Sequence, residues 1–332
     1  PGGTIVGCCG VMRHDDKAAE LRKMYLRREA RGDGVGQRLL ERAIAFARLL
    51  GKVQIKVFEM PGFVTTRVAL PLVNDAKIPF FGPFTGAEIL RDPVSKWVFH
   101  LRASYYDETE LIVRQLTSLG LNRIAVFYQN DSYGKAGLEG TVRALKRRNL
   151  EPVAASTVER NTVDVAKAVA DIVPSNANAI VQISAYKSCA AFIRAARKAG
   201  FGGTFHNVSF VGTQALADEL GPDGKGVVIS QVMPFPYSQS MPITREFHAA
   251  IAKANGVAAN YSSLEGYLAA KVFADGLRRA GRNPTREQLI SGLEAIQRAD
   301  FGGLAVDFGV RDRVASSYVD LSMLTGDGKV RR

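Results

Sequence analysis

The 332-residue sequence contains few of the residues that build disulfide frameworks or metal centres. Its three cysteines are an adjacent pair, Cys8 and Cys9, and a distant Cys189, too few for a disulfide scaffold or a four-ligand zinc site. The four histidines have no mutual spacing typical of metal ligands. No apolar run reaches about 18 residues, which excludes a membrane-spanning helix in this sequence. We therefore expect no bound metal.

Groupings that point to catalysis or to nucleic-acid binding are also missing. No acid–base pair and no nucleophile with an adjacent base occurs at a convincing spacing, so no catalytic residue is predicted. Lys and Arg total 44 against 32 Asp and Glu, a net charge of +12, which is a profile that nucleic-acid binders share. Here, however, the basic residues are spread along the chain, and clusters such as 146–148 fall at expected helix ends. We expect no nucleic-acid partner.

Most of the chain alternates between strand and helix patterns. Continuous apolar runs separated by amphipathic segments predict parallel sheets covered on both faces, an α/β fold. The expected strands are 53–58, 78–82, 97–102, 123–128, 153–158, 179–184, 207–212, 227–232, 303–308 and 317–324. The expected helices lie near 65–76, 106–119, 134–148, 163–173, 187–199 and 213–219, and 241–295 is mostly helical.

The first 52 residues have a different pattern. Residues 4–13 and 19–28 predict a β-hairpin with its turn at 14–17, followed by a glycine-rich bend and a helix over 35–50. Glycines before a helix N-terminus can hold a pyrophosphate, because free backbone N–H groups and the helix dipole favour anions. The alternative is structural: the glycines serve the turn, and the segment is kept for packing.

The bend carries the pattern Arg31-x-x-Gly34-x-Gly36, with a strand before it and a helix after it. The run 20–50 thereby resembles the acetyl-CoA-binding segment of the GNAT-type N-acetyltransferases. That resemblance implies a pyrophosphate held by backbone amides and a pantetheine arm paired with the preceding strand, at Arg31, Gly32, Gly34, Gly36, Met24 and Leu26. It covers part of a domain, and no amine-acceptor site can be named. We expect acetyl-CoA only if this segment is functional, and otherwise no cofactor.

Six segments farther along occur in a fixed order. They are ALPLVNDAKIPFFGPFTGAEILRD (69–92), VFHLRAS (98–104), AVFYQNDSYGKAGLEG (125–140), VQISAYKSCAAFIRAARKAG (181–200), SQVMPFP (230–236) and YSSLEGYLAAKVFADGLRRAG (261–281). Through them, residues 58–332 resemble the leucine/isoleucine/valine-type substrate-binding proteins of ABC importers, which have the type I periplasmic-binding fold. The resemblance implies two doubly wound lobes that close on a small ligand and membrane subunits as partners. It also implies a periplasmic location, whereas the sequence as written shows no signal-peptide pattern and by itself favours the cytoplasm.

The expected division gives residues 1–52 to the GNAT-like segment. Residues 53–104 with 236–300 form lobe one, and 105–235 with 301–332 form lobe two. Lobe one lacks the first strands of a complete type I binding fold. A ββαβ unit from the N-terminal segment could replace them, because a strand, a helix and a following strand make a right-handed crossover.

Candidate ligand-binding residues follow the expected strands, because open parallel sheets bind ligands outside the carboxyl ends of their strands. The carboxyl ends of the expected strands 78–82 and 97–102, with the loops that follow them, contain Phe84, Arg102 and Tyr105. The resemblance adds a ligand carboxylate bound by Thr85, Ser104 and one of Thr65 or Thr66, and tyrosines that close from the far lobe, Tyr133 and Tyr186. A purely structural role in the turn stays open for Tyr133.

The residue that follows Thr213 leaves the identity of the ligand undecided. Thr213 lies where the family binds a ligand ammonium, often with a nearby acid, but Gln214 follows it here. An amino acid, an aromatic or aliphatic acid and an amide all remain candidates. We expect a substrate-binding protein without covalent chemistry. The alternatives are a GNAT-type N-acetyltransferase using acetyl-CoA and a ligand-sensing regulatory module.

Overall fold

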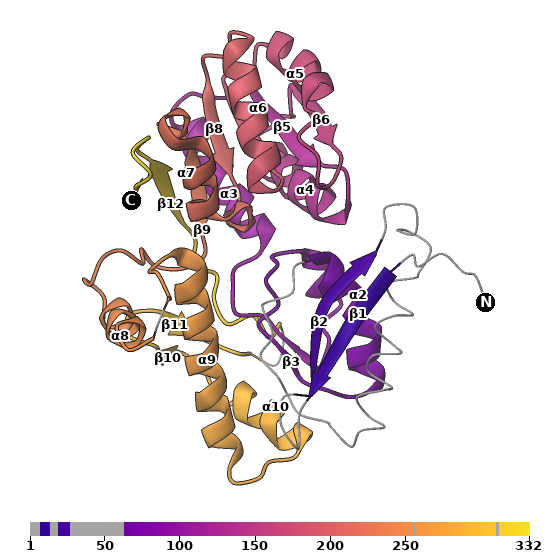
Figure 1. Cartoon of the computed structure of the whole chain (residues 1–332), viewed down its shortest axis with the longest axis vertical. Coiled ribbons are helices and arrows are strands. Elements are labelled where there is room, and N and C mark those ends of the chain that lie inside the picture. The colour runs from indigo at the N-terminus through magenta and orange to yellow at the C-terminus, as the bar shows by residue number, and fades with distance from the viewer. Residues whose placement is uncertain (1–6, 14–18, 27–62, 255, 310–311) are drawn as a thin grey trace, which may run out of the picture.

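The structure is a computed structural model, and it describes residues 7–13, 19–26, 63–254, 256–309 and 312–332. The described residues from 63 onward form two lobes, one above the other in Figure 1. The chain crosses between them three times: before α3 (Tyr105–Ser118), after β9 (Val228–Gln231) and before β12 (Asp320–Leu324). No helix within these ranges is long and apolar enough to cross a membrane.

A seven-stranded sheet forms the centre of the upper lobe. Its order is β13 (Val330–Arg331), β12, β9, β8 (Thr204–Asn207), β7 (Ala179–Ile183), β5 (Ile124–Gln129) and β6 (Ala154–Val158). The strands from β6 to β9 are parallel, and β12 and β13 extend the sheet in antiparallel fashion. Every residue of β7 is buried, so helices cover both faces there. This confirms the predicted α/β fold with a mostly parallel sheet.

Helices separate the parallel strands, as the sequence predicts. They are α3, α4 (Ser132–Lys146), α5 (Ala166–Ile172), α6 (Tyr186–Lys198) and α7 (Thr213–Leu220), with short 3-10 helices at Val173–Ser175, Ser209–Val211 and Gly221–Gly224. Asp131 caps α4 by accepting hydrogen bonds from the N–H groups of Tyr133 and Gly134. This cap sets where α4 begins, just beyond the carboxyl end of β5.

One expected strand, 207–212, is wrong. Strand β8 ends at Asn207, and Ser209–Val211 forms a 3-10 helix. The backbone N–H of Ser209 donates to the Glu108 carboxylate at 2.7 Å instead of to a neighbouring strand. Gly212 then takes a left-handed conformation with φ of 81°, which ends the extended path before α7.

The lower lobe is mostly helical, with short strand pairs. It contains α2 (Phe63–Asp75), β3 (Phe80–Phe81), a 3-10 helix at Glu88–Leu90, β4 (Val98–Phe99), α8 (Pro242–Ile251), α9 (Tyr261–Ala280), α10 (Arg286–Glu294), β10 (Ala299–Asp300) and β11 (Ala305–Val306). The expected strands here are longer than those formed: β3 pairs with β4 over two residues each, and β10 with β11 likewise. An isolated parallel bridge between His100 and Val314 continues the edge of β4.

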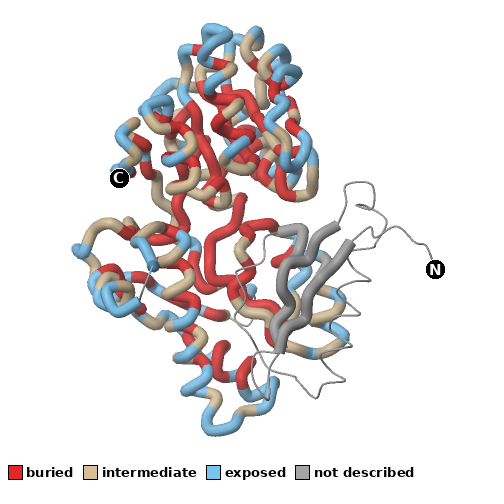
Figure 2. Tube along the Cα trace, in the orientation of Figure 1, coloured by how far each residue is buried: buried red, intermediate tan, exposed pale blue. Residues whose placement is uncertain are grey.

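Buried side chains form a core in each lobe and continue through the segment that joins β4 to α3, shown in red in Figure 2. Aromatic rings dominate the lower core. The Phe81 ring lies 5.5 Å from that of Phe273 and 5.9 Å from that of Phe308, and Phe99 lies 5.3 Å from Phe308. Edge-to-face pairs of this kind add to the free energy gained from apolar burial. They fix β3 and β4, and so the loops that follow those strands.

The N-terminal strands pair as predicted, with β1 (Gly7–Arg13) antiparallel to β2 (Ala19–Leu26), and the expected turn at 14–17 lies outside the described residues. This pair is a sheet of its own and shares no ladder with β3 or β4. The expected helix 35–50 and strand 53–58 lie outside the described residues, so completion of lobe one by this segment stays a prediction.

At the other end of the chain, β11 pairs with β10 in the lower lobe, while β12 and β13 join the upper sheet. The last crossing therefore lies between 306 and 320, later than the expected division at 301.

Candidate functional site

The two lobes meet where their strands end. Phe84 follows β3, and Arg102 follows β4, both from the lower side. Ser209 follows β8 and Thr213 begins α7, from the upper side. Loops at the carboxyl ends of parallel strands converge in this way. They enclose a cavity of about 10 Å³, the interlobe cavity, whose lining comprises Phe84, Arg102, Ser209, Thr213, Gln231, Val232, Met233, Tyr261, Ser262 and Glu265. That volume is about what one water molecule needs.

Arg102 is the central charged group of this contact, with 1% of its surface exposed. Its Nη2 donates to the Ser209 hydroxyl at 2.6 Å, and its guanidinium carbon lies 4.4 Å from the centre of the Phe84 ring. Nε lies 3.3 Å from Oε1 of Glu265, an ion-pair distance without hydrogen-bond alignment, and Nη1 has no partner. Burial alone would lower the pKa of Arg102, but Glu265 and Glu108 more than offset it and raise that pKa. The guanidinium therefore stays charged.

Two buried carboxylates flank this guanidinium. Glu108 of α3 accepts hydrogen bonds from the Ser209 N–H at 2.7 Å, the Ser209 hydroxyl at 3.0 Å and the Ser230 hydroxyl at 2.6 Å. Glu265 of α9 is 3% exposed and faces the interlobe cavity. Burial raises the pKa of both carboxyl groups, because the interior disfavours their charged form. Ser209 thus connects Arg102 to Glu108 through its hydroxyl.

An aromatic layer lies beside this polar cluster. The Phe84 ring of the lower lobe lies 5.6 Å from the Phe210 ring of the upper lobe, and Tyr133 lies 4.6 Å from Phe210. Tyr105 packs 5.5 Å from Tyr133. Burial raises the pKa of Tyr133 well above its usual value, and its hydroxyl has no hydrogen-bond partner. The contact between Phe84, which lines the interlobe cavity, and Phe210 joins the two lobes.

Two of the expected carboxylate binders have local structural roles. Ser104 caps α3: its hydroxyl donates to Oδ2 of Asp107 at 2.8 Å and accepts from the Asp107 N–H at 3.1 Å. Thr85 is fully buried; its oxygen accepts from the Ala87 N–H at 3.3 Å and its hydroxyl donates to the Tyr105 hydroxyl at 3.4 Å. Neither lines the interlobe cavity, whereas Phe84, Arg102 and Thr213 do.

Of the remaining expected ligand residues, Thr66 and Tyr186 are not among those that line this cavity. Thr66 is buried in α2, while the side chain of Thr65 lies outside the described residues. Tyr186 begins α6 and is half-buried. Of the positions expected to hold acetyl-CoA, Met24 and Leu26 lie in β2, and Arg31, Gly32, Gly34 and Gly36 lie outside the described residues.

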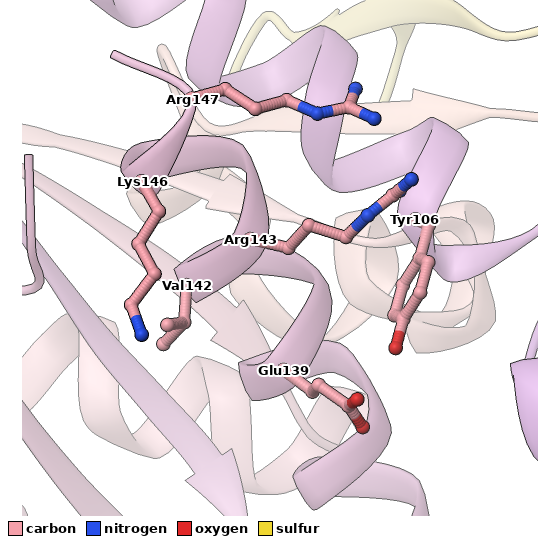
Figure 3. A pocket seen from close by; sticks show the side chains of 6 residues that line it. All are labelled: Tyr106, Glu139, Val142, Arg143, Lys146 and Arg147. Atoms are coloured by element: carbon pink, nitrogen blue, oxygen red, sulfur yellow. The ribbon is translucent and has the colours of Figure 1, made fainter. Parts of the chain in front are cut away.

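A second, larger pocket lies on the outside of the upper lobe, between α3 and α4. It has a volume of about 550 Å³ and is lined by Tyr106, Glu139, Val142, Arg143, Lys146 and Arg147. Figure 3 shows Arg143 extending toward Tyr106, and its guanidinium carbon lies 4.7 Å from the ring centre. Burial, followed by a hydrogen bond to Glu139, raises the pKa of Tyr106 to about 12. No expected site residue lines this open groove.

Comparison with known proteins fits the two-lobed geometry. The sequence model of the periplasmic binding protein family matches residues 42–329. The chain belongs to this family. The chain is 32% identical to a solved structure described as a possible leucine/isoleucine/valine-binding protein from Rhodopirellula baltica, with a TM-score of 0.77, covering 81% of this chain and 74% of that one. A substrate-binding periplasmic protein from Ralstonia solanacearum is also 32% identical, with a TM-score of 0.75 and coverage of 81% and 77%.

The chain is also similar to a curated relative whose name refers to Leu/Ile/Val binding. The Leu/Ile/Val-binding protein homolog 7 of Brucella abortus is 27% identical over 273 residues, or 75% of this chain and 66% of the relative. The chain thus spans less than two thirds of that relative's length. A second sequence model, the acetyltransferase (GNAT) domain, matches residues 2–77. The two matches overlap from residue 42 to residue 77 and so both include α2.

Sequence reasoning missed several residues of this binding protein's crevice. Glu108, Ser209, Gln231, Tyr261 and Glu265 were not singled out. Gln231 ends β9, so its position near the end of the expected strand 227–232 could have indicated it. Ser209 could not be found in this way, because the expected strand 207–212 places it inside a strand. Glu265 follows Leu264 on the buried face of α9, where the helical pattern expects an apolar residue. No group of three or more His, Cys, Asp and Glu side chains in the described ranges could hold a metal ion.

Proposed function

We propose that this periplasmic binding protein holds a small amino acid, or a related carboxylate or amide, between its lobes and delivers it to the membrane subunits of an ABC importer. Arg102 carries the proposal. A buried guanidinium with an unpartnered Nη1 beside a cavity is a strong donor for a ligand carboxylate. Hydroxyl and amide groups of Thr213, Gln231 and Ser262 line the same space and offer polar contacts.

Binding requires the lobes to separate. The interlobe cavity of about 10 Å³ is far smaller than the roughly 300 Å³ or more of a typical small-molecule pocket. The Phe84 ring of the lower lobe contacts the Phe210 ring of the upper lobe, and this contact must break when the lobes open. Three crossings join the lobes, and a few residues in such segments can absorb the rotation of a hinge. The proposed cycle is opening, capture and closure, with no covalent chemistry.

A ligand panel tests this function on the full chain. We would measure thermal unfolding with amino acids, aromatic and aliphatic acids, and amides, and follow positive compounds by calorimetry. A ligand at a hundredfold excess over its Kd should stabilise the protein by about 2.7 kcal/mol. Small-angle scattering should show a smaller radius of gyration with that ligand than without it. No stabilisation by any compound would contradict the proposal.

One observation favours a second candidate function. The acetyltransferase (GNAT) domain match over residues 2–77 supports acetyl-CoA binding by the N-terminal segment. The same thermal panel distinguishes the two functions. Stabilisation by acetyl-CoA, with none by the small-molecule ligands, would make an N-acetyltransferase the better proposal.

A further inference from the structure

The open groove between α3 and α4 is large enough to hold a small molecule. Its volume of about 550 Å³ lies within the roughly 300–1,000 Å³ of typical ligand pockets, whereas the interlobe cavity measures about 10 Å³. The two spaces share no lining residue. Because the basic side chains of the groove are exposed, a ligand can reach them without any movement of the lobes.

The lining of this groove has an excess of positive charge. Three of its side chains are basic and one is acidic, a net charge of +2. The acidic residue, Glu139, accepts a hydrogen bond from the Tyr106 hydroxyl. The nearby Glu110 is shared by two arginines, with Oε2 at 3.2 Å from Nη1 of Arg147 and Oε1 at 2.7 Å from Nη2 of Arg148. These carboxylates therefore do not neutralise the groove.

Two of the basic side chains form no ion pair with the part of the chain that the structure describes. Lys146 is exposed, and Arg143 places its guanidinium 4.7 Å from the centre of the Tyr106 ring instead of on a carboxylate. Basic residues often serve the last carbonyl groups of a helix. Here Arg148 does so, because its Nη1 donates to the Ala144 oxygen at 2.8 Å. The charges of Lys146 and Arg143 are thus not used by the end of α4.

The basic groups are arranged around apolar surface. Arg143 and Arg147 are four positions apart, so they lie on the same face of the helix. Figure 3 shows both side chains extending toward the same side, with Arg143 directed at Tyr106, while Lys146 extends beside Val142. The ring of Tyr106 and the side chain of Val142 are lining residues of the same groove. The site can therefore contact an anionic group and an organic group together.

We propose that this groove binds a phosphate monoester, with the phosphate on Arg143, Lys146 and Arg147 and the organic group against Tyr106 and Val142. At pH 7 such a phosphate carries a charge of about −1.5 to −2, which matches the +2 of the lining, whereas one carboxylate balances half of it. Guanidinium groups bind phosphate through paired hydrogen bonds and present a flat face on which a planar ring can stack. The inference is independent of the proposed function.

Three probes test the site by calorimetry on the full chain at pH 7 in low-salt buffer. Adenosine 5′-monophosphate carries a phosphate and a planar ring, ribose 5-phosphate lacks the ring, and adenosine lacks the phosphate. The monophosphate should bind with a Kd below about 1 mM and at least about tenfold more tightly than adenosine. Ribose 5-phosphate should fall between the two. Higher ionic strength should weaken binding of both phosphates, because the cations are exposed to solvent.

A variant locates the binding. Lys146→Gln removes a charge that has no acidic partner among the described residues, so it should weaken binding of adenosine 5′-monophosphate about three- to fivefold without lowering the unfolding temperature. Lys135→Gln is the matched control, because it makes the same charge change at an exposed position of α4 outside the groove lining. Its Kd should stay within about twofold of wild type. Arg143→Gln should weaken binding by about the same factor as Lys146→Gln.

Several results would overturn the proposal. One is equal affinity for adenosine 5′-monophosphate and adenosine, and another is no binding of either phosphate. An equal loss of affinity in Lys146→Gln and Lys135→Gln would also overturn it, because the phosphate would then respond to the overall charge of the protein. Vesicles of phosphatidylglycerol and phosphatidylcholine offer lipid phosphate instead. If wild type sediments with them, Lys146→Gln does not, and neither soluble phosphate binds, the groove contacts a membrane surface and the proposal fails.

Discussion

Ser209 donates two hydrogen bonds to the carboxylate of Glu108, one from its backbone N–H at 2.7 Å and one from its hydroxyl at 3.0 Å. The same hydroxyl accepts a hydrogen bond from Nη2 of Arg102 at 2.6 Å. The two residues lie 101 positions apart, on the 3-10 helix after β8 and on α3. Their contact holds the end of a strand, the start of a helix and the central arginine of the crevice in one arrangement.

Glu108→Ala should therefore destabilise the fold strongly. It removes the acceptor of three buried hydrogen bonds from Ser209 and Ser230, and it removes one of the two carboxylates beside Arg102. Removing one partner of such a buried charge cluster costs about 3–5 kcal/mol. Urea denaturation measures this loss of unfolding free energy. Glu110→Ala on the same helix is the control; its partners Arg147 and Arg148 lie nearer the surface, so its loss should be below about 1 kcal/mol. Equal losses in the two variants would contradict the assigned role of Glu108.

Two glycines of α9 should respond in opposite ways to alanine. A Cβ at Gly276 would lie 2.4 Å from Cδ2 of Leu293, which is fully buried, so Gly276→Ala should cost about 1–3 kcal/mol through overpacking. A Cβ at Gly266 meets nothing within 4 Å, so Gly266→Ala should stabilise the helix by about 0.5–1 kcal/mol. Thermal unfolding measures both changes. A stabilised Gly276→Ala would show that α9 and α10 pack less closely than described.

Removing a single hydroxyl group should weaken ligand binding where the hydroxyl lines the cavity and should leave it nearly unchanged elsewhere. Thr213 lines the interlobe cavity, whereas Tyr186 does not. Thr213→Val removes a hydroxyl that contacts Gln231 at 2.8 Å and should weaken ligand binding by about five- to tenfold. Tyr186→Phe should leave the Kd within about twofold, because a hydroxyl outside the site contributes little. Calorimetry with the best ligand of the panel measures both, and the reverse ranking would place the ligand elsewhere.

Acid should destabilise the protein through His206. Burial lowers the pKa of this histidine to about 4, whereas an exposed histidine in the unfolded chain titrates near 6.5. Between these values the unfolded state binds a proton that the folded state does not, so the unfolding free energy falls as the pH falls. From pH 6.5 to pH 5 this group accounts for about 2 kcal/mol.

His206→Gln should therefore give a flatter dependence of unfolding free energy on pH over that range. Glu108 and Glu265 act in the opposite direction, since burial raises the pKa of their carboxyl groups, but they are present in both proteins and cancel in the comparison. Denaturant titrations at pH 6.5 and pH 5 supply the measurement. Parallel curves for wild type and variant would mean that His206 is protonated in the folded state.

The sheet of the upper lobe could be predicted because its strands are continuous apolar runs. In β7 all five residues are buried, so the strand could be predicted without deciding which of its side chains face the core. The boundaries of β8 could not be predicted, because the chain leaves the sheet at Ser209 for a partner on α3, and that contact joins residues far apart in sequence. Local patterns carry no information about such tertiary hydrogen bonds.

Some of the site residues could likewise be predicted from the sequence, and others could not. Phe84, Arg102 and Thr213 follow or precede predicted elements at the sheet edge, and they line the cavity. Ser104 was expected at the ligand, yet the spacing of Ser104 and Asp107 is also that of a capping box, and the helix cap uses the hydroxyl. Glu265 falls on the apolar face of α9, which indicates burial, but its contact with Arg102 on the crossing segment is a tertiary one that sequence spacing does not reveal.

The position of Arg102 on the first crossing has a consequence for the order of ligand capture. His100 is anchored by its backbone to Arg313 and Ala315, and Ser104 is anchored by its helix cap, so Arg102 lies at the middle of a three-residue pivot. When the lobes swing apart, a group near the pivot moves little, whereas Phe84 and Glu265 travel with the lower lobe. We expect an incoming ligand to contact the nearly stationary Arg102 guanidinium first. It should contact Phe84 and Glu265 last, when the lobes close.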